Sequence, residues 1–235
     1  MINPFTILWK SVVDVYGELF PMVGMNVLWL ILSIPIVLVV TLVLMLFKVP
    51  GELALPIALL FALLAPSPSS VGIQNYVNQL VKEERVEFDL FWAGLRTLWR
   101  PSLILLGISV FGTALLGVNL MFYLSSSLTV LHYFAILWLY AIVVWIIMML
   151  YMNPLLVEQE NKSIKLIVRN SFLLAVDNVI PSLVLVVVLL VLSAVSIGIT
   201  LLVALLTASL AATVETRAVL SYLEKYRLRA AKQSS

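Results

Sequence analysis

Five long runs without a single Asp, Glu, Lys or Arg constrain this chain more than any other feature of its sequence. Four of them, at residues 22–47, 53–71, 102–124 and 132–157, each have about the 20 residues that one membrane crossing needs. The fifth, at residues 181–214, is nearly twice that long. Because 63% of the chain is hydrophobic and 11% is charged, against about 45–50% and 25% in soluble domains, the sequence predicts an all-α integral membrane protein.

The basic residues predict the orientation of the chain. All of the 14 Lys and Arg residues except Lys48 lie before the first run, between the second and third, after the fourth, or at the C-terminus. Such residues accumulate on the cytoplasmic side, and all four groups share that side only if the fifth run is a hairpin that turns near residues 193–198. We therefore expect a polytopic helix bundle of six membrane segments in one domain over 1–235, with both termini cytoplasmic. The first run is too long for the h-region of a cleavable signal peptide.

Several segments outside the runs have the spacing of amphipathic helices. Residues 4–20 place apolar side chains at i, i+3, i+4 and i+7, with Asn3 as the N-cap and Pro4 at the first helical position. The same spacing recurs at 73–81, 91–99 and 164–176. Beside the last of these, Lys162, Lys165 and Arg169 lie on a different face, which suits contact with anionic lipid headgroups or an acidic partner. We expect interfacial helices at the cytoplasmic membrane surface.

Three prolines suggest an internal repeat. Pro21, Pro101 and Pro181 are 80 residues apart, and each stands between an amphipathic segment and a membrane run. This spacing predicts a threefold repeat of about 80 residues, with units 1–72, 73–157 and 158–235. The alternative is that proline simply favours helix starts.

The largest set of polar side chains in and beside the runs clusters at one depth, near the cytoplasmic ends of the first, second and fourth. Two interpretations are open: the set lines a cavity that binds a polar ligand, or it bonds packed helices together and satisfies backbone groups freed by proline. The lack of an accompanying charge favours helix packing. The set consists of Asn26, Ser33, Ser67, Ser69, Ser70, Gln74, Asn75, Asn78, Asn153 and Glu158.

The residues that catalysis, metal binding or cofactor binding would need are absent from the sequence or stand alone in it. Cysteine is absent and His132 is the single histidine, so the sequence offers no thiolate site, no metal site and no serine nucleophile with a base. Glycines are scattered, which argues against a phosphate loop or a nucleotide cofactor, and a net charge of +2 gives no basic stripe for nucleic acid. The one candidate for a lipid-modifying enzyme is the carboxylate group Glu83, Glu84, Glu87 and Asp89, which is more simply a solvated turn. We predict no catalytic residue, cofactor or metal.

Several motifs resemble the YesL-like family, bacterial integral membrane proteins of unknown function. They are the run 26–37 with Asn26, Trp29, Ser33 and Pro35, the serines around Pro68, the segment 76–81, and Phe91 and Gly94 after the charged turn. The match is in order and spacing, covers the first half of the chain best, and departs from the family in having a second proline, at position 66.

The resemblance implies a location and a role. Members of the family are bacterial inner-membrane proteins, often encoded beside components of carbohydrate ABC transporters. It therefore implies a non-enzymatic accessory or scaffold protein, with membrane lipids, ABC permease subunits or further copies of itself as partners. The alternative is that the chain is a small-molecule or lipid transporter in its own right, which the repeat and the prolines favour and the uncharged runs weaken.

Overall fold

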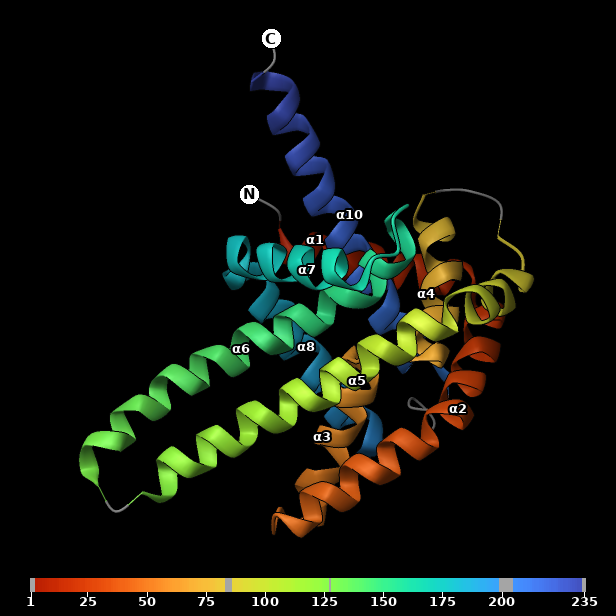
Figure 1. Ribbon diagram of the computed structural model, residues 1–235. Helices are drawn as coiled ribbons and strands as arrows, with labels where there is room; N and C mark the ends of the chain where they lie inside the picture. Colours follow the sequence, from red (N-terminus) through yellow and green to blue (C-terminus); the bar gives the residue numbers. More distant parts are fainter. Residues whose placement is uncertain (1–2, 83–85, 127, 199–204, 234–235) are drawn as a thin grey trace.

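The computed structural model describes residues 3–82, 86–126, 128–198 and 205–233 (Figure 1). Within these ranges every regular element is an α-helix, which confirms the all-α class. The helices are α1 (Pro4–Gly17), α2 (Leu19–Leu46), α3 (Gly51–Leu64), α4 (Pro68–Val81), α5 (Asp89–Ser125), α6 (Thr129–Glu158), α7 (Ile164–Asp177), α8 (Val179–Gly198) and α10 (Thr207–Gln233).

Helices of membrane-spanning length and composition dominate the structure. Among the described residues α2, α5, α6 and α8 are long and apolar enough to cross a membrane, and α3 with α4 forms a further candidate that bends by 52° at the break between the two helices. These properties are those of a multi-pass membrane protein. The start of α1 is also as predicted, because Asn3 Oδ1 accepts a hydrogen bond from Phe5 N at 3.0 Å and Pro4 follows the cap.

The interior lies where α4, α6 and α10 pack on one another. Each of these helices contributes a fully buried tyrosine, namely Tyr76, Tyr151 and Tyr222, and the last two rings meet edge to face at 5.8 Å. In Figure 1, α5 and α6 form a long hairpin that extends away from the rest, while α1 and α7 lie across the end where α10 leaves the bundle. Both ends of the described chain are on this side.

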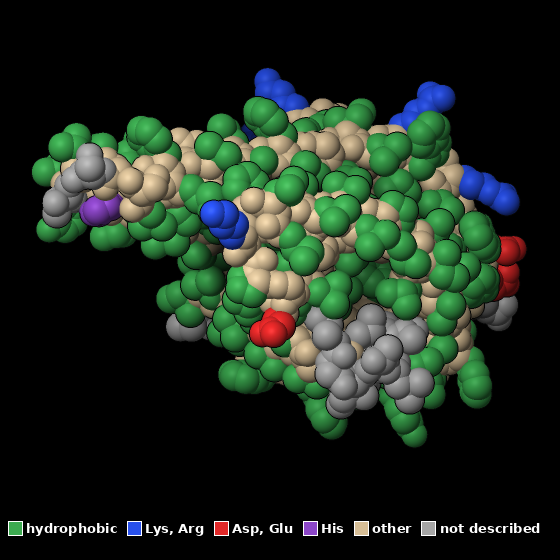
Figure 2. Space-filling view, turned by 90° about the horizontal axis from the view of Figure 1, so that it is seen from below, with side chains coloured by type: hydrophobic (Ala, Val, Ile, Leu, Met, Phe, Trp, Pro, Cys, Tyr) green, Lys and Arg blue, Asp and Glu red, His purple; other side chains and the backbone are tan. Residues whose placement is uncertain are grey.

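The outer surface is apolar, as expected for contact with lipid. Large side chains such as Phe111, Phe122, Tyr133 and Ile136 on the α5–α6 hairpin are more than half exposed. Figure 2, which views the molecule from the side opposite the termini, shows hydrophobic side chains over most of that face and few charged ones. In a membrane this surface meets acyl chains rather than water.

Three details differ from the sequence predictions. Helix α8 continues through residues 193–198, so the predicted turn position is wrong. The Ser196 hydroxyl of α8 lies 2.8 Å from the Thr207 hydroxyl at the start of α10, so these two helices meet here. Residues 91–99 are not a separate interfacial helix, because α5 runs without interruption through Pro101. Residues 73–81 belong to α4, where Ile73, Tyr76 and Val77 are buried in the interior rather than lying on a membrane surface.

Helix α4 also bears on the predicted repeat. It runs from Pro68 to Val81, so the proposed unit boundary between residues 72 and 73 falls inside a helix. The chain breaks between helices at Glu18 and again at Asn178, 160 residues later, with similar backbone angles (φ −118°, ψ 39° and φ −131°, ψ 37°).

Candidate functional site: a buried polar cluster around Glu215

The break between α3 and α4 brings three serines into the interior. Proline at 66 and 68 cannot continue the helix and restricts the residue before it to extended conformations, so the chain kinks and α4 restarts with Ser67 as its N-cap. The Ser67 hydroxyl accepts a hydrogen bond from Ser70 N at 3.2 Å, and Pro68 occupies the first turn. Ser67, Ser69 and Ser70 are all buried.

These serines form a connected chain of hydroxyl groups with α2. Ser33 Oγ lies 3.0 Å from Ser69 Oγ, and Ser67 Oγ lies 3.0 Å from Ser69 Oγ and 2.9 Å from Ser70 Oγ. Trp29 Nε1 donates to Ser70 Oγ at 3.1 Å. The chain joins α2 to the kink and positions the fully buried indole ring of Trp29.

Asn26 caps the N-terminus of α10, a helix that begins inside the protein. Its Oδ1 accepts hydrogen bonds from Ala208 N at 2.6 Å and from Ser209 N at 3.2 Å, and Ser209 Oγ donates to Met22 O at 2.9 Å. The first N–H groups of a helix have no partner in their own helix, and here α2 supplies one from 182 residues earlier in the sequence. Asn26 therefore acts as a helix cap, which is a packing role.

Gln74 ties α4 to α10 in the same way. Its Nε2 donates to Ala212 O at 3.3 Å and to Thr216 Oγ1. The structure thus brings six of the nine amide and serine candidates into one buried polar cluster, defined as Asn26, Ser33, Ser67, Ser69, Ser70 and Gln74, together with Trp29. The hydrogen bonds among the serines and Trp29, and those from Asn26 and Gln74 to α10, join one helix to another and favour the packing interpretation for this group.

The other three candidates lie apart from this cluster. Asn75 donates to Leu90 O at 2.8 Å and joins α4 to the start of α5. Asn78 donates to Glu158 Oε2 at 3.2 Å, and Lys82 Nζ lies 2.6 Å from the same oxygen. Asn153 is fully buried on α6, and both of its amide atoms lack a hydrogen-bond partner among the described residues.

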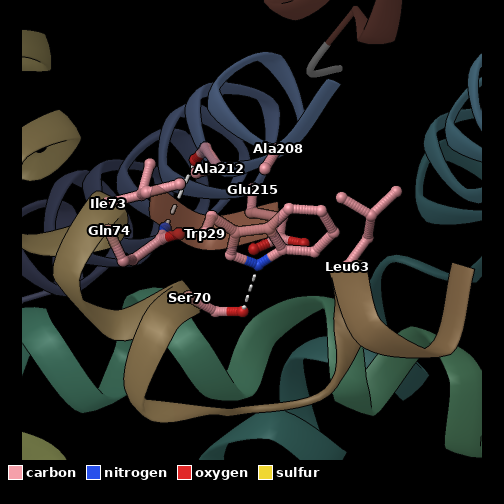
Figure 3. A pocket seen from close by; sticks show the side chains of 8 residues that line it. All are labelled: Trp29, Leu63, Ser70, Ile73, Gln74, Ala208, Ala212 and Glu215. Carbon is pink, nitrogen blue, oxygen red and sulfur yellow. Dashed lines mark hydrogen bonds between the residues drawn. The ribbon is translucent and has the colours of Figure 1, made fainter. Parts of the chain in front are cut away.

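Glu215 on α10 is the residue that sequence reasoning missed. Its side chain is 1% exposed, and its Oε1 has no hydrogen-bond partner in the described part of the chain. Figure 3 shows the Glu215 carboxylate beside the indole ring of Trp29, with Gln74 to the left and Ser70 below. A cavity of about 10 Å³ adjoins these residues, which is room for about one water molecule.

The lining of this cavity brings no opposite charge to Glu215. It consists of Trp29, Leu63, Ser70, Ile73, Gln74, Ala208 and Ala212 beside the glutamate itself. The position of Glu215, one residue after the 181–214 run, kept it outside the predicted spans. A usable signal was the composition around it, since residues 207–219 hold mainly Ala, Ser, Thr and Val, the small residues with which membrane helices pack closely.

Four of the residues on which the YesL-like resemblance was based, Phe91, Gly94, Pro35 and Pro68, lie in helices or at contacts between helices. Phe91 is fully buried and lies against Gly72, where an added Cβ would come within 2.8 Å of its ring. A Cβ on Gly94 would lie 2.6 Å from Asn75 Cβ, so α4 and α5 touch here through glycine. Pro35 lies inside α2, and Pro68 starts α4.

The three basic candidates differ in what they contact. Lys162 Nζ donates to Val157 O at 2.7 Å, at the C-terminal end of α6, where a cation is favoured. Burial lowers the pKa of Lys162, Lys82 lowers it further, and Glu158 opposes the shift. Lys165 and Arg169 are exposed on α7. These two, rather than Lys162, are available to a headgroup or partner.

Helices α1 and α7 are both fastened to α10 by charged side chains. Arg217 donates to both carboxylate oxygens of Asp14 on α1, with Nη2 to Oδ1 at 2.7 Å. On α7, Asp177 accepts hydrogen bonds from Tyr226 and, at 3.2 Å, from Lys225. The Tyr226 hydrogen bond is the main cause that holds the pKa of Asp177 below its ordinary value of 3.8, and Lys225 lowers it further.

Groups for other chemistry are sparse in the described part of the chain. No set of three or more His, Cys, Asp or Glu side chains there is placed to hold a metal ion. Of the carboxylates considered for a lipid-modifying enzyme, Glu87 and Asp89 are exposed, and Glu83 and Glu84 lie outside the described residues.

In comparisons with family models, with curated proteins and with solved structures, no match to this chain was found.

Proposed function

We propose that this protein is a non-enzymatic component of the bacterial inner membrane, acting as an accessory or scaffold for carbohydrate ABC uptake systems. The observation that carries the non-transport role is the closed interior. The serines and Trp29 of the cluster are bonded to one another, and Asn26 and Gln74 are bonded to α10. The cavity beside them has room for about one water. A sugar would need a chamber of hundreds of Å³. The pocket of that size, about 510 Å³, lies apart from the cluster, between α1 and α10 at the end of the bundle where both termini lie. The link to carbohydrate uptake is supported by the YesL-like resemblance alone.

We further propose six membrane segments with both termini in the cytoplasm. Both ends of the described chain lie at the same end of the bundle (Figure 1), which requires an even number of crossings. The candidates α2, α3 with α4, α5, α6 and α8 supply five. The first half of α10, which turns back beside α8 and is buried through Val219, supplies the sixth.

The proposed threefold repeat has support from burial. Met25, Leu105 and Leu185 are 80 residues apart, and each is fully buried. Ser11 and Ser171, 160 residues apart, make the same hydrogen bond to the carbonyl four residues earlier, at 2.9 and 2.8 Å. Units that each begin with α1, α5 or α7 fit the helices better than a boundary at 72/73.

We propose that α1 and α7 lie in the headgroup region of the cytoplasmic leaflet. On α1, Trp9 and Tyr16 are 69% and 79% exposed although both are aromatic, and such rings are favoured at the membrane interface. On α7, the exposed Lys165 and Arg169 add attraction for anionic lipids or an acidic partner surface.

The test is purification of the tagged protein in mild detergent from its bacterial host, grown with and without complex carbohydrate, followed by mass spectrometry. Permease or ATPase subunits of sugar transporters in stoichiometric amounts support the proposal. The double charge reversal of Lys165 and Arg169 to Glu is expected to lose these subunits, whereas Arg227→Glu, an exposed change on α10, keeps them. Recovery of the protein alone, as a defined oligomer, contradicts the accessory role.

One observation favours the second candidate, a transporter in its own right. Helices α4 and α10 both begin in the interior of the protein, next to the buried Glu215. Helices that start at membrane depth and intramembrane carboxylates are typical of transporter binding sites. Uptake of labelled sugars or lipids by proteoliposomes that contain the purified chain alone would support this candidate over the first.

A further inference from the structure

A stripe of polar side chains leads along α4 from Glu215 to the surface. Ser70, Gln74 and Asn78 on α4 and Lys82 at its C-cap are spaced four residues apart, which places them along one face of the helix. Ser70 and Gln74 line the cavity beside Glu215, and Lys82 pairs with Glu158. The stripe spans about 18 Å at 1.5 Å per residue. We call these four residues the α4 polar stripe.

The two ends of the α4 polar stripe differ in their access to water. Ser70, Gln74 and Asn78 are between 1% and 6% exposed, whereas the Lys82 side chain is 34% exposed. In the middle, Asn78 Oδ1 has no hydrogen-bond partner in the described ranges. Buried polar atoms left without a protein partner are commonly satisfied by ordered water. The stripe thus has the polar groups that a short water file needs.

Glu215 is the one charged side chain at the buried end. An ionised carboxylate without a cation in an apolar interior is far more costly than the neutral acid. A neutral carboxylic acid has one O–H donor, and a water in the adjacent cavity could accept it. The carboxyl and the cavity therefore suit one particular ligand, a single proton exchanged with water.

The other ionisable groups on the helices around α10 do not line the cavity. Arg217, two residues further along α10, is paired with Asp14 on α1. Helices α2 and α8 carry no Asp, Glu, Lys, Arg, His or Tyr. The remaining ionisable groups on the elements that pack against α10, and on α10 itself before its exposed end, are Lys10 and Tyr16 on α1, Glu52 on α3, Tyr76 on α4, His132, Tyr133, Tyr140, Tyr151 and Glu158 on α6, and Tyr222 and Glu224 on α10.

We propose that Glu215 is a proton-binding site that exchanges its proton with water along the α4 polar stripe. On uptake, a hydronium ion at the stripe transfers a proton to one carboxylate oxygen: one O–H bond of hydronium breaks, the O–H bond of the carboxyl group forms, and a neutral water molecule is left. Release is the reverse of this step. The site goes beyond the scaffold role and does not depend on it. The protein then has an interior carboxyl group whose protonation state can respond to the pH on the cytoplasmic side.

The experiment is infrared spectroscopy of the purified protein in lipid nanodiscs, in H₂O and D₂O and across a pH series. We expect a carbonyl band of a protonated carboxyl group that disappears in Glu215→Gln and remains in Glu224→Gln, an exposed glutamate on the same helix. The band should shift on transfer to D₂O, because the proton exchanges. A band that is absent from the wild type, or that does not shift in D₂O, overturns the proposal.

A second pair of variants tests the route. Asn78→Leu interrupts the α4 polar stripe, and we expect it to slow the D₂O shift by about tenfold or more, equivalent to a barrier higher by about 1.4 kcal/mol. Gln79→Leu, a neighbouring amide off the stripe, should leave the rate unchanged. Equal rates in both variants contradict the route. A titration midpoint that moves when Na⁺ replaces choline contradicts the choice of a proton as the ligand.

The wild-type measurement does not depend on any variant. If Glu215→Gln does not accumulate, Glu215→Asp keeps a carboxyl group in a shorter side chain, and its band should move in frequency. A carboxyl band that stays unchanged in Glu215→Asp belongs to another residue and overturns the assignment.

Discussion

The cap that Asn26 provides for α10 gives a quantitative prediction. Asn26→Ala removes the acceptor of two buried backbone N–H groups, on Ala208 and Ser209. Loss of a side-chain cap typically costs about 1 kcal/mol, and a buried donor left without a partner costs about 1–3 kcal/mol. Two donors lose their acceptor, and the cost of the lost cap describes the same two groups and is not added to theirs, so we expect the free energy of unfolding to fall by about 2–4 kcal/mol.

The measurement is thermal unfolding in detergent, followed by near-UV circular dichroism. For a chain of this size about 2–4 °C is lost per kcal/mol, so the midpoint should fall by about 5–15 °C. The matched control is Asn119→Ala on α5, where the amide donates to the carbonyl of Leu115 four residues earlier in its own helix. That change should stay within about 0.5 kcal/mol of the wild type.

The result that would refute this reasoning is an Asn26→Ala midpoint equal to that of Asn119→Ala. It would mean that the N–H groups at the start of α10 find other acceptors, and that α10 does not depend on α2 for its N-terminus. A large loss in both variants would instead indicate that any polar change in the apolar helices is destabilising.

Three further predictions concern packing, pH and topology. Gly94→Ala should destabilise the fold by about 1–3 kcal/mol through overpacking, because its Cβ would lie 2.6 Å from an α4 side chain. The control, Gly107→Ala on the same helix, meets no described atom within 4 Å and should be neutral or slightly stabilising. Chemical denaturation of the two variants measures the difference in their free energies of unfolding. The depressed pKa of Asp177 means that its contribution to stability is present above pH 3.8 and is lost as the pH falls through the lowered pKa. The difference in stability between the wild type and Asp177→Asn should therefore shrink in that acid range, as thermal unfolding across a pH series would show. A cysteine in place of Ser126, in the loop between α5 and α6, should react with an impermeant maleimide from the side opposite to a cysteine appended at the C-terminus, as labelling of intact cells and inverted vesicles would show.

The elements themselves were largely predictable from the sequence. The apolar runs correspond to α2, α5, α6 and α8. The ends agree within a few residues for α2 and α6, whereas α5 begins well before its run and the fifth run extends past the end of α8. Sequence signals that depend only on neighbouring residues were reliable at two places. Asn3 and Pro4 start α1, and the prolines at 66 and 68 mark the break between α3 and α4. At Pro101 the same signal was misleading, because packing of α5 against α4 and α6 keeps the helix continuous.

The partners of the polar residues were not predictable. The bond between Asn26 and the start of α10 joins residues 182 apart, and nothing local in either segment specifies it. Nor could the sequence divide Gln74 from Asn75, which are adjacent on α4 but face α10 and α5 respectively. Side-chain direction on a helix changes by about 100° per residue, so a cluster defined by depth alone mixes different interfaces.

The most hydrophobic helices of this fold are not the most buried ones, and for this reason the buried Glu215 lies outside the apolar runs of the sequence. The apolar window of α2 is only 11% buried within the protein, since its side chains face lipid. The first half of α10 is rich in Ala, Ser and Thr and almost entirely buried. When the solvent is as apolar as leucine, small and weakly polar residues gain more from close helix contact than large apolar ones do. The interior of such a protein is therefore best sought in its least hydrophobic helix, and that helix carries the single buried carboxyl group of the proposed site.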